Sequence, residues 1–333
     1  MLQSSVTTVP PVLAGAAPVA YVERDGTVES VHLGTLATRD AAGTPAGPER
    51  GDPDTPFFPR STLKPLQAVA MLHAGLDLGA HDDAELLALA SASHSGEPGH
   101  VEGVRRILAG AGLGEDDLEN TPDLPFGEQV HAEAVAAGTA PSRVLQNCSG
   151  KHAAMVATCV AAGWPTRGYL DPGHPLQQRI RATVTELTGV EPAVTTVDGC
   201  GAPLFATTPA GLARAFARLA VAAPDTPEGR VAAAVREHPW WVGGTGRAVT
   251  RLAGAVPGLV AKDGAEGVLV AALPDGRAFA LTVLDGSPRP LPVVGGAVLD
   301  ALGAGSPALD AAARVDVLGH GLPVGRVRAV LTD

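Results

Sequence analysis

Lysine is the residue whose scarcity is most informative in this chain. Only three of the 24 basic residues are lysine, at Lys64, Lys151 and Lys262, and the others are arginine. Arginine stays protonated at any working pH, whereas a buried lysine can lose its proton and act as a base. A chain that uses arginine almost everywhere can keep lysine where a neutral amine is needed. Codon usage would give the same count, so the surroundings of each lysine must decide.

Lys64 lies in an S-x-x-K pattern that begins at Ser61 and is followed by Pro65. Because proline belongs in the first turn of a helix, we expect Ser61 at or next to a helix N-cap and Lys64 one turn later on the same face. A desolvated lysine can take the proton from a serine hydroxyl, which is a poor nucleophile without a base. S-x-x-K is the nucleophile signature of the serine β-lactamases and penicillin-binding proteins. The alternative is an N-cap serine beside a solvated lysine.

Lys262 follows a predicted strand and precedes Asp263 and Gly264. This segment resembles the K-T-G strand of the same enzymes, whose glycine lets the backbone approach the substrate closely. Between two predicted helices, Ser93 and Ser95 are both candidates for the second catalytic hydroxyl of such a site. Taken alone, Lys262 could be a turn lysine and the serines could be helix caps.

The third lysine belongs to a group with metal-ligand character. Cys148, Lys151 and His152 are spaced to project to one side of a predicted helix, and Cys200 has glycine on both sides. Two thiolates and one nitrogen form a zinc-like set with room for a water or a substrate. Spacing alone favours His152 as the nitrogen ligand, because an ammonium group must first lose its proton. The alternative is a pair of small buried hydrophobic residues, which is the interpretation for Cys159 inside an apolar helix.

The elements that must position these residues are strands at both ends of the chain and helices between them. Strands are predicted in a hairpin within 18–38 and over 259–261, 267–273, 278–284 and 325–331. Helices are predicted over 63–76, 82–92, 98–111, 128–137, 149–162, 174–188, 209–222, 227–237, 245–255 and 293–302.

Strands from the two ends of a chain can pair into one antiparallel sheet covered by helices. We therefore expect an α+β fold in a single catalytic unit, with a cleft between two lobes. The sheet lobe would take about 1–60 and 257–333, and the helical lobe about 61–256.

Composition narrows the class of protein. The chain has 333 residues, 45% of them hydrophobic, and a net charge of −11, which favours a globular protein and argues against binding to nucleic acid. No apolar run reaches the roughly 18 to 20 residues of a membrane span, and the start lacks the basic segment of a secretory signal. Three cysteines do not make a disulfide framework. We expect a cytoplasmic protein with no membrane partner.

Five motifs, in order along the chain, resemble those of the class 3 bacterial L-asparaginases, also called the thermolabile asparaginase II family. They are RSTLKP at 60–65, SHSGEP at 93–98, CSGKH at 148–152, DGCGAP at 198–203 and AKDGAEG at 261–267. The resemblance implies a fold like that of the serine β-lactamases and glutaminases. It also implies hydrolysis of L-asparagine to L-aspartate and ammonia by a homodimer.

The resemblance further implies catalytic roles for single residues. Ser61 would be the nucleophile with Lys64 as its base, and Ser93 and Lys262 would form a second Ser-Lys pair. Ser93 is favoured over Ser95 by its position in the motif.

The resemblance also implies how metal and substrate are held. Cys148, Lys151 and Cys200 would bind one zinc per chain, with Lys151 as a neutral amine where spacing alone favours His152. Asp198 would hold the α-amino group of the substrate. The other residues implied to line the site are Arg60 and His152.

Two other functions stay open on the sequence. Another S-x-x-K acyl hydrolase, a glutaminase or a β-lactamase-like enzyme, would share the serine and lysine motifs but would need no metal at Cys148 and Cys200. In a non-catalytic zinc protein, a zinc ion bound by the two cysteines would hold the two lobes together, and the serines would be helix caps.

Overall fold

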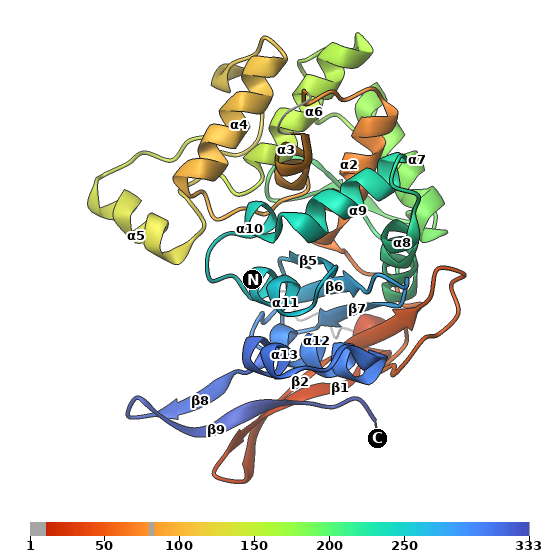
Figure 1. Cartoon of the computed structure of the whole chain (residues 1–333), viewed down its shortest axis with the longest axis vertical. Coiled ribbons are helices and arrows are strands. Elements are labelled where there is room, and N and C mark those ends of the chain that lie inside the picture. The colour runs from red at the N-terminus through yellow and green to blue at the C-terminus, as the bar shows by residue number, and fades with distance from the viewer. Residues whose placement is uncertain (1–10, 80–82, 333) are drawn as a thin grey trace, which may run out of the picture.

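A computed structural model describes residues 11–79 and 83–332 of the chain. This part contains a seven-stranded antiparallel sheet and a set of helices, which confirms the predicted α+β fold (Figure 1). The strand order is β5-β6-β7-β2-β1-β9-β8. The strands are β1 (Ala17–Arg24), β2 (Thr27–Arg39), β5 (Val260–Gly264), β6 (Val268–Ala272), β7 (Ala278–Val283), β8 (Asp316–Gly319) and β9 (Leu322–Ala329). Strands from the two ends of the chain meet because β2 pairs with β7 and β1 pairs with β9.

The central strands are buried on both faces. Along β6, Val268 and Val270 belong to one hydrophobic core, and Leu269 and Ala271 belong to another. This alternation follows from the two-residue period of a strand. Helix α8 (Pro209–Val221) covers the first face, and α11 (Ala248–Ala255), α12 (Leu291–Leu299) and α13 (Pro307–Ala313) lie toward the second (Figure 1).

Most of the other helices gather beyond the end of the sheet that carries β5 (Figure 1). They are α2 (Lys64–His73), α3 (Asp83–Ala90), α4 (Pro98–Gly110), α5 (Glu128–Ala136), α6 (Ser149–Ala162), α7 (Pro175–Thr188), α9 (Pro227–Glu237) and α10 (Pro239–Val242). Helix α6 contacts α2, α3, α4 and α7, so its residues from Ser149 to Cys159 are all buried. No helix in the described ranges is long and apolar enough to cross a membrane.

The structure departs from the predicted elements at several short segments. The expected helix at 245–255 begins only at Ala248, because Gly244 and Gly246 have positive φ angles and form a turn. Short elements that were not predicted are α1 (Pro11–Ala14), α10, α13, β8 and a separate hairpin of β3 (Thr195–Val197) and β4 (Pro203–Phe205).

The expectation that Ser61 lies at or next to a helix N-cap is wrong. Residues Arg60–Leu63 form a 3-10 turn, and α2 begins after it at Lys64. The N-cap residues of the turn and of α2 are Pro59 and Leu63, and neither helix start has a side-chain cap. The tighter turn places Ser61 ahead of the α-helix instead of at its cap.

Candidate active site

Ser61 lies in a turn that is held in an uncommon backbone conformation. Arg60, directly before it, has a φ of 53°, in the left-handed region that costs a non-glycine residue about 1–3 kcal/mol. The turn is braced by a hydrogen bond from Thr62 Oγ1 to the Pro59 carbonyl of 2.7 Å and by Gly264 of β5, which packs against it. Ser61 itself is half-buried. Such strain is characteristic of functional sites, where the surrounding structure imposes it.

All three lysines are buried, with Lys64 1%, Lys151 2% and Lys262 0% exposed. A lysine is almost never fully buried unless its amine is paired. Each lysine of the chain therefore occupies an enclosed position, where its amine must be paired.

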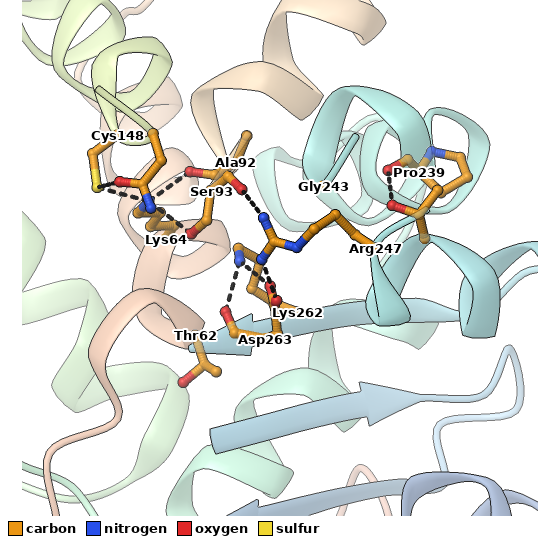
Figure 2. A network of polar contacts seen from close by, with 12 residues as sticks. Thr62, Lys64, Ala92, Ser93, Cys148, Pro239, Gly243, Arg247, Lys262 and Asp263 are labelled. Atoms are coloured by element: carbon orange, nitrogen blue, oxygen red, sulfur yellow. Dashed lines mark hydrogen bonds and ion pairs between the residues drawn. The ribbon is translucent and has the colours of Figure 1, made fainter. Parts of the chain in front are cut away.

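The amine of Lys64 contacts three groups from two other segments, the 92–93 turn and the start of α6 (Figure 2). Its Nζ donates to the Ala92 carbonyl at 2.6 Å, to Ser93 Oγ at 2.9 Å and to Cys148 Sγ at 3.1 Å. Among the described residues, the Ser61 hydroxyl is hydrogen-bonded to no lysine. Lys64 thus pairs with the second predicted hydroxyl, and Ser61 lies one turn before it.

The two candidate serines of the 93–98 motif have different surroundings. Ser93 lies at the Lys64 amine, whereas Ser95 Oγ donates to the Gly243 carbonyl at 2.9 Å and so binds a neighbouring loop. His94, between them, is 2.9 Å from Ser149 Oγ through its Nε2 and fixes the turn to the start of α6. Ser93 is therefore the serine of this turn that faces the lysine.

Lys262 lies on β5 with its amine turned to the neighbouring carboxylate. Its Nζ donates to the Asp263 carbonyl at 2.6 Å and to Asp263 Oδ1 at 2.8 Å. Burial lowers the pKa of Lys262 to about 8; Asp263 opposes this change, and Lys64 and Arg247 reinforce it. No hydrogen bond joins Lys262 to Ser93 within the described chain. The amine is nevertheless able to exist in its neutral form near physiological pH.

Ser61 and Ser93 line one cleft of about 220 Å³. The other residues along its wall include Phe126, Asn147, Arg247, Asp263, Gly264 and Glu266. Drug-sized ligands occupy pockets of about 300–1,000 Å³, so a cleft of this size suits a molecule as small as an amino acid.

An ion pair connects the serine turn to the cysteine loop. Arg60 Nε donates to Asp198 Oδ1 at 2.9 Å, and the same oxygen accepts from the Gly199 N–H at 2.8 Å. Both side chains are mostly buried. Arg60 also lies 3.6 Å from a carboxylate oxygen of the exposed Glu266. Arg60 precedes Ser61 and contacts Glu266, two residues of the cleft wall, so this pair of opposite charges lies next to the cleft without forming part of its wall.

Cys148 and Cys200 come together from two separate segments. Cys148 is the residue before α6, and Cys200 lies in the loop between β3 and β4; both are buried. A hydrogen bond between the two sulfur groups lowers the pKa of Cys200 and raises that of Cys148. Cys159 is separate, lies in the hydrophobic core as expected, and its burial raises the pKa of its thiol to about 11.

Lys151 is the nitrogen beside these sulfurs. Its Nζ donates to Cys200 Sγ at 3.2 Å. Burial disfavours the charged amine, but the charges of Cys200, Cys148 and Asp198 outweigh burial and raise the pKa of Lys151. A cation that binds here must therefore displace the proton of the amine.

His152 lies beside both Tyr169 and Cys200, and its burial, the largest effect, lowers its pKa. Its Nδ1 is 3.1 Å from the Tyr169 hydroxyl, and its Nε2 is buried without a hydrogen-bond partner among the described residues. In the described ranges, no three His, Cys, Asp or Glu residues form a group that could hold a metal. A metal bound by the two cysteines would need Lys151 as its third protein ligand. Two buried sulfurs and an amine do fit a thiophilic cation such as Zn²⁺.

Several residues of the site were not singled out in the sequence. Arg247 and Asn147 line the cleft, and Tyr169 supports His152. The signal for Arg247 was the run Gly243-Gly244-Thr245-Gly246 before a helix, since such a run forms a tight turn that can present the next side chain.

A comparison with models of protein families identifies the family of this chain. The model of the family described as L-asparaginase II matches residues 20–329. The chain belongs to this family. The match covers every residue of the cleft and both cysteines, and it confirms the resemblance carried by the five motifs. The L-asparaginase II family consists of amidohydrolases, so the chain is an enzyme of that kind. A comparison with curated proteins gives no match.

Proposed function

We propose that the chain hydrolyses L-asparagine to L-aspartate and ammonia, with Ser61 as nucleophile and the buried lysines as bases. The observation that carries this proposal is the convergence of Ser61 and Ser93 on one small cleft beside buried amines, in a chain of the L-asparaginase II family. An amide needs a nucleophile, a base that can take its proton and an acid that can protonate the leaving nitrogen. Serine and lysine together supply all three.

In the proposed acylation step, Ser61 Oγ attacks the side-chain carbonyl of asparagine. Its proton passes to the amine of Lys64, either directly or through the Ser93 hydroxyl, which lies 2.9 Å from that amine. A backbone N–H near Ser61 stabilises the negative oxygen of the tetrahedral intermediate. The protonated lysine then donates to the leaving nitrogen, ammonia departs, and an ester remains on Ser61.

In the proposed deacylation step, water attacks this ester and a lysine takes the proton of the water. Lys262 is suited to this role because its pKa of about 8 leaves part of the amine neutral near physiological pH. The bond between Ser61 and the acyl carbon then breaks, the serine regains a proton, and L-aspartate leaves.

Recognition of the substrate is assigned to the ion pair beside the cleft. A free amino acid carries an ammonium group and a carboxylate. In our proposal Asp198 binds the ammonium group, and Arg60, held at 2.9 Å from Asp198, lies beside the carboxylate. His152, which is buried and hydrogen-bonded to Tyr169, is assigned to the lining of the site on the family resemblance.

The metal site is part of the same proposal. Cys148, Lys151 and Cys200 would hold one zinc per chain, because their two sulfurs and one amine lie together in a buried position. When bound, zinc would supply Lewis acidity or order the site. A homodimer is likewise proposed on the family resemblance, and a cytoplasmic location and a single catalytic unit are proposed on the sequence pattern.

Purified protein tests the proposal through ammonia release from L-asparagine and from L-glutamine, with zinc measured on the same sample. We expect asparagine-selective release and about one zinc per chain. Ser61→Ala should give a folded, zinc-loaded protein without activity, whereas Ser30→Ala, on an exposed part of β2, should match the wild type. Wild-type activity in Ser61→Ala would show that Ser61 is not the nucleophile. Zinc without amidase activity would favour a structural role for the metal.

A further inference from the structure

We propose that Arg247 is a positioning residue for Lys262: it binds the carboxylate of Asp263, the group that pairs with the Lys262 amine, and so sets how firmly that amine holds its proton. This inference rests on the proposed function, in which Lys262 acts as a base.

The contacts form a continuous chain across the cleft (Figure 2). Asp263 Oδ1 accepts from Lys262 Nζ at 2.8 Å, and Asp263 Oδ2 accepts from Arg247 Nη2 at 2.7 Å. The other guanidinium nitrogen, Nη1, donates to the Ser93 carbonyl at 3.3 Å. One arginine therefore joins β5 to the turn that carries Ser93.

The loop that presents Arg247 is fixed by residues that the proposed chemistry leaves unused. Glu97 accepts from the Thr245 N–H at 2.7 Å and from the Thr245 hydroxyl at 2.8 Å, while Ser95 binds the Gly243 carbonyl. Gly244 has a φ of 110°, and a Cβ there would lie 2.3 Å from Ser95 Oγ. The 93–98 motif thus supplies Ser93 to the cleft and also anchors the loop of Arg247.

Arg247 is held from a second side as well. It is the residue before α11, and the ring of Phe126 lies over its guanidinium at 4.6 Å. The guanidinium and the Asp263 carboxylate are each about one-fifth exposed, whereas Lys262 is fully enclosed. A charge pair in this setting is weakly screened and acts strongly on the enclosed amine.

Within the described ranges, three charged groups act on Lys262. Asp263 on the same strand favours the ammonium form, and Lys64 on α2 and Arg247 before α11 disfavour it. The residues that α9 buries and all of β6 are apolar, and Arg60, in the turn packed on β5, is paired with Asp198 and Glu266. Removal of Arg247 would leave Lys64 as the one remaining charge of the three that opposes Asp263, so Lys262 would hold its proton more firmly. Removal of the Asp263 charge would have the opposite effect.

The test uses the fact that the chain has only three lysines. Protein labelled with ¹³C and ¹⁵N in lysine gives three side-chain amine signals, and the one lost in Lys262→Gln belongs to Lys262. We expect Arg247→Gln to raise the pH midpoint of the Lys262 signal by about one pH unit and Asp263→Asn to lower it by a similar amount. Arg247→Lys keeps the charge, adds a fourth lysine signal, and should leave the midpoint of the Lys262 signal near the wild-type value. The low-pH limb of kcat/KM should move in the same directions.

The inference is supported if the midpoint of the Lys262 signal rises in Arg247→Gln and falls in Asp263→Asn. Loss of a merely structural contact would not change the midpoint in opposite directions in the two variants. The inference is overturned if the midpoint changes in the same direction in both variants or does not change. If Arg247→Gln does not fold, Arg247→Met, which keeps the length of the side chain without its charge, takes its place: an unchanged or lowered Lys262 midpoint in that variant is then the refuting result. The lysine signals need no substrate. An inactive wild type would therefore refute the proposed function, and the sign of the midpoint changes would still decide the role of Arg247.

Discussion

Replacement of Gly264 by alanine tests whether β5 positions the nucleophile turn. Gly264 follows Lys262 and Asp263 on β5 and lines the cleft. A Cβ at this position would lie 3.0 Å from the Pro59 carbonyl oxygen and 3.4 Å from the Ser61 nitrogen. The φ angle of Gly264 is not in the left-handed region, so alanine can adopt its backbone conformation. The effect of the added methyl group is then confined to the turn that it touches.

The expected magnitude follows from the required displacement. An oxygen at 3.0 Å from a carbon must recede by a few tenths of an ångström to reach ordinary contact. A misplacement of about 1 Å can cost about a hundredfold in rate, so we expect Gly264→Ala to lower kcat by about fivefold to tenfold. Overpacking of this kind costs about 1–2 kcal/mol of the free energy of unfolding. The variant should therefore remain folded while it turns over slowly.

The assay is ammonia release at saturating L-asparagine, with thermal denaturation of the same samples. Gly254→Ala is the matched control, because Gly254 lies in α11 with nothing within 4 Å of an added Cβ. This control should keep full activity and gain about 0.5–1 kcal/mol in stability, as expected for alanine in a helix. Wild-type kcat in a folded Gly264→Ala protein would refute the reasoning that β5 sets the position of Ser61.

Three further predictions concern the serines, the pH dependence and the metal. Ser93→Ala should lower kcat by about a hundredfold or more, since it removes the hydroxyl at the Lys64 amine, and Ser95→Ala should lower it much less; the reverse order in steady-state kinetics would contradict the assignment. In the wild type, kcat/KM should fall as the pH drops below about 8, because Lys262 must be neutral to act as a base, and a flat profile there would exclude it. Cys200→Ser should lose zinc and thermal stability, whereas Cys159→Ala should retain the metal, as elemental analysis of both proteins can establish.

Features determined by local sequence could be predicted without the structure. The bounds predicted for α6 and α9 agree with the structure, since each has apolar residues at helical spacing and an end marked by glycine or proline. The pairing of terminal strands followed from strand patterns that flank a helical centre. The burial of all three lysines agrees with the unusual balance of lysine and arginine.

The features that escaped prediction depend on contacts between distant segments. Lys64 and Ser93 are 29 positions apart, and Arg247 and Ser93 are 154 apart. The late start of α11 has the same origin, because Glu97 binds the backbone of Thr245 and holds the preceding residues in a turn. Periodicity describes one element at a time and carries no information on which ends of elements will meet.

Lys262 and Lys151 show why residue type and burial together do not determine chemistry. Both amines are enclosed, and burial disfavours the ammonium form of each. The pKa of Lys262 nevertheless falls and that of Lys151 rises, because their partners differ. The carboxylate beside Lys262 is shared with Arg247, whereas Lys151 faces the sulfurs of Cys200 and Cys148 and the charge of Asp198. Lys64 binds Cys148 but not Cys200 in the described chain. An arginine in place of Lys262 would preserve the ion pair and abolish the base, which is a physical reason for lysine at this position.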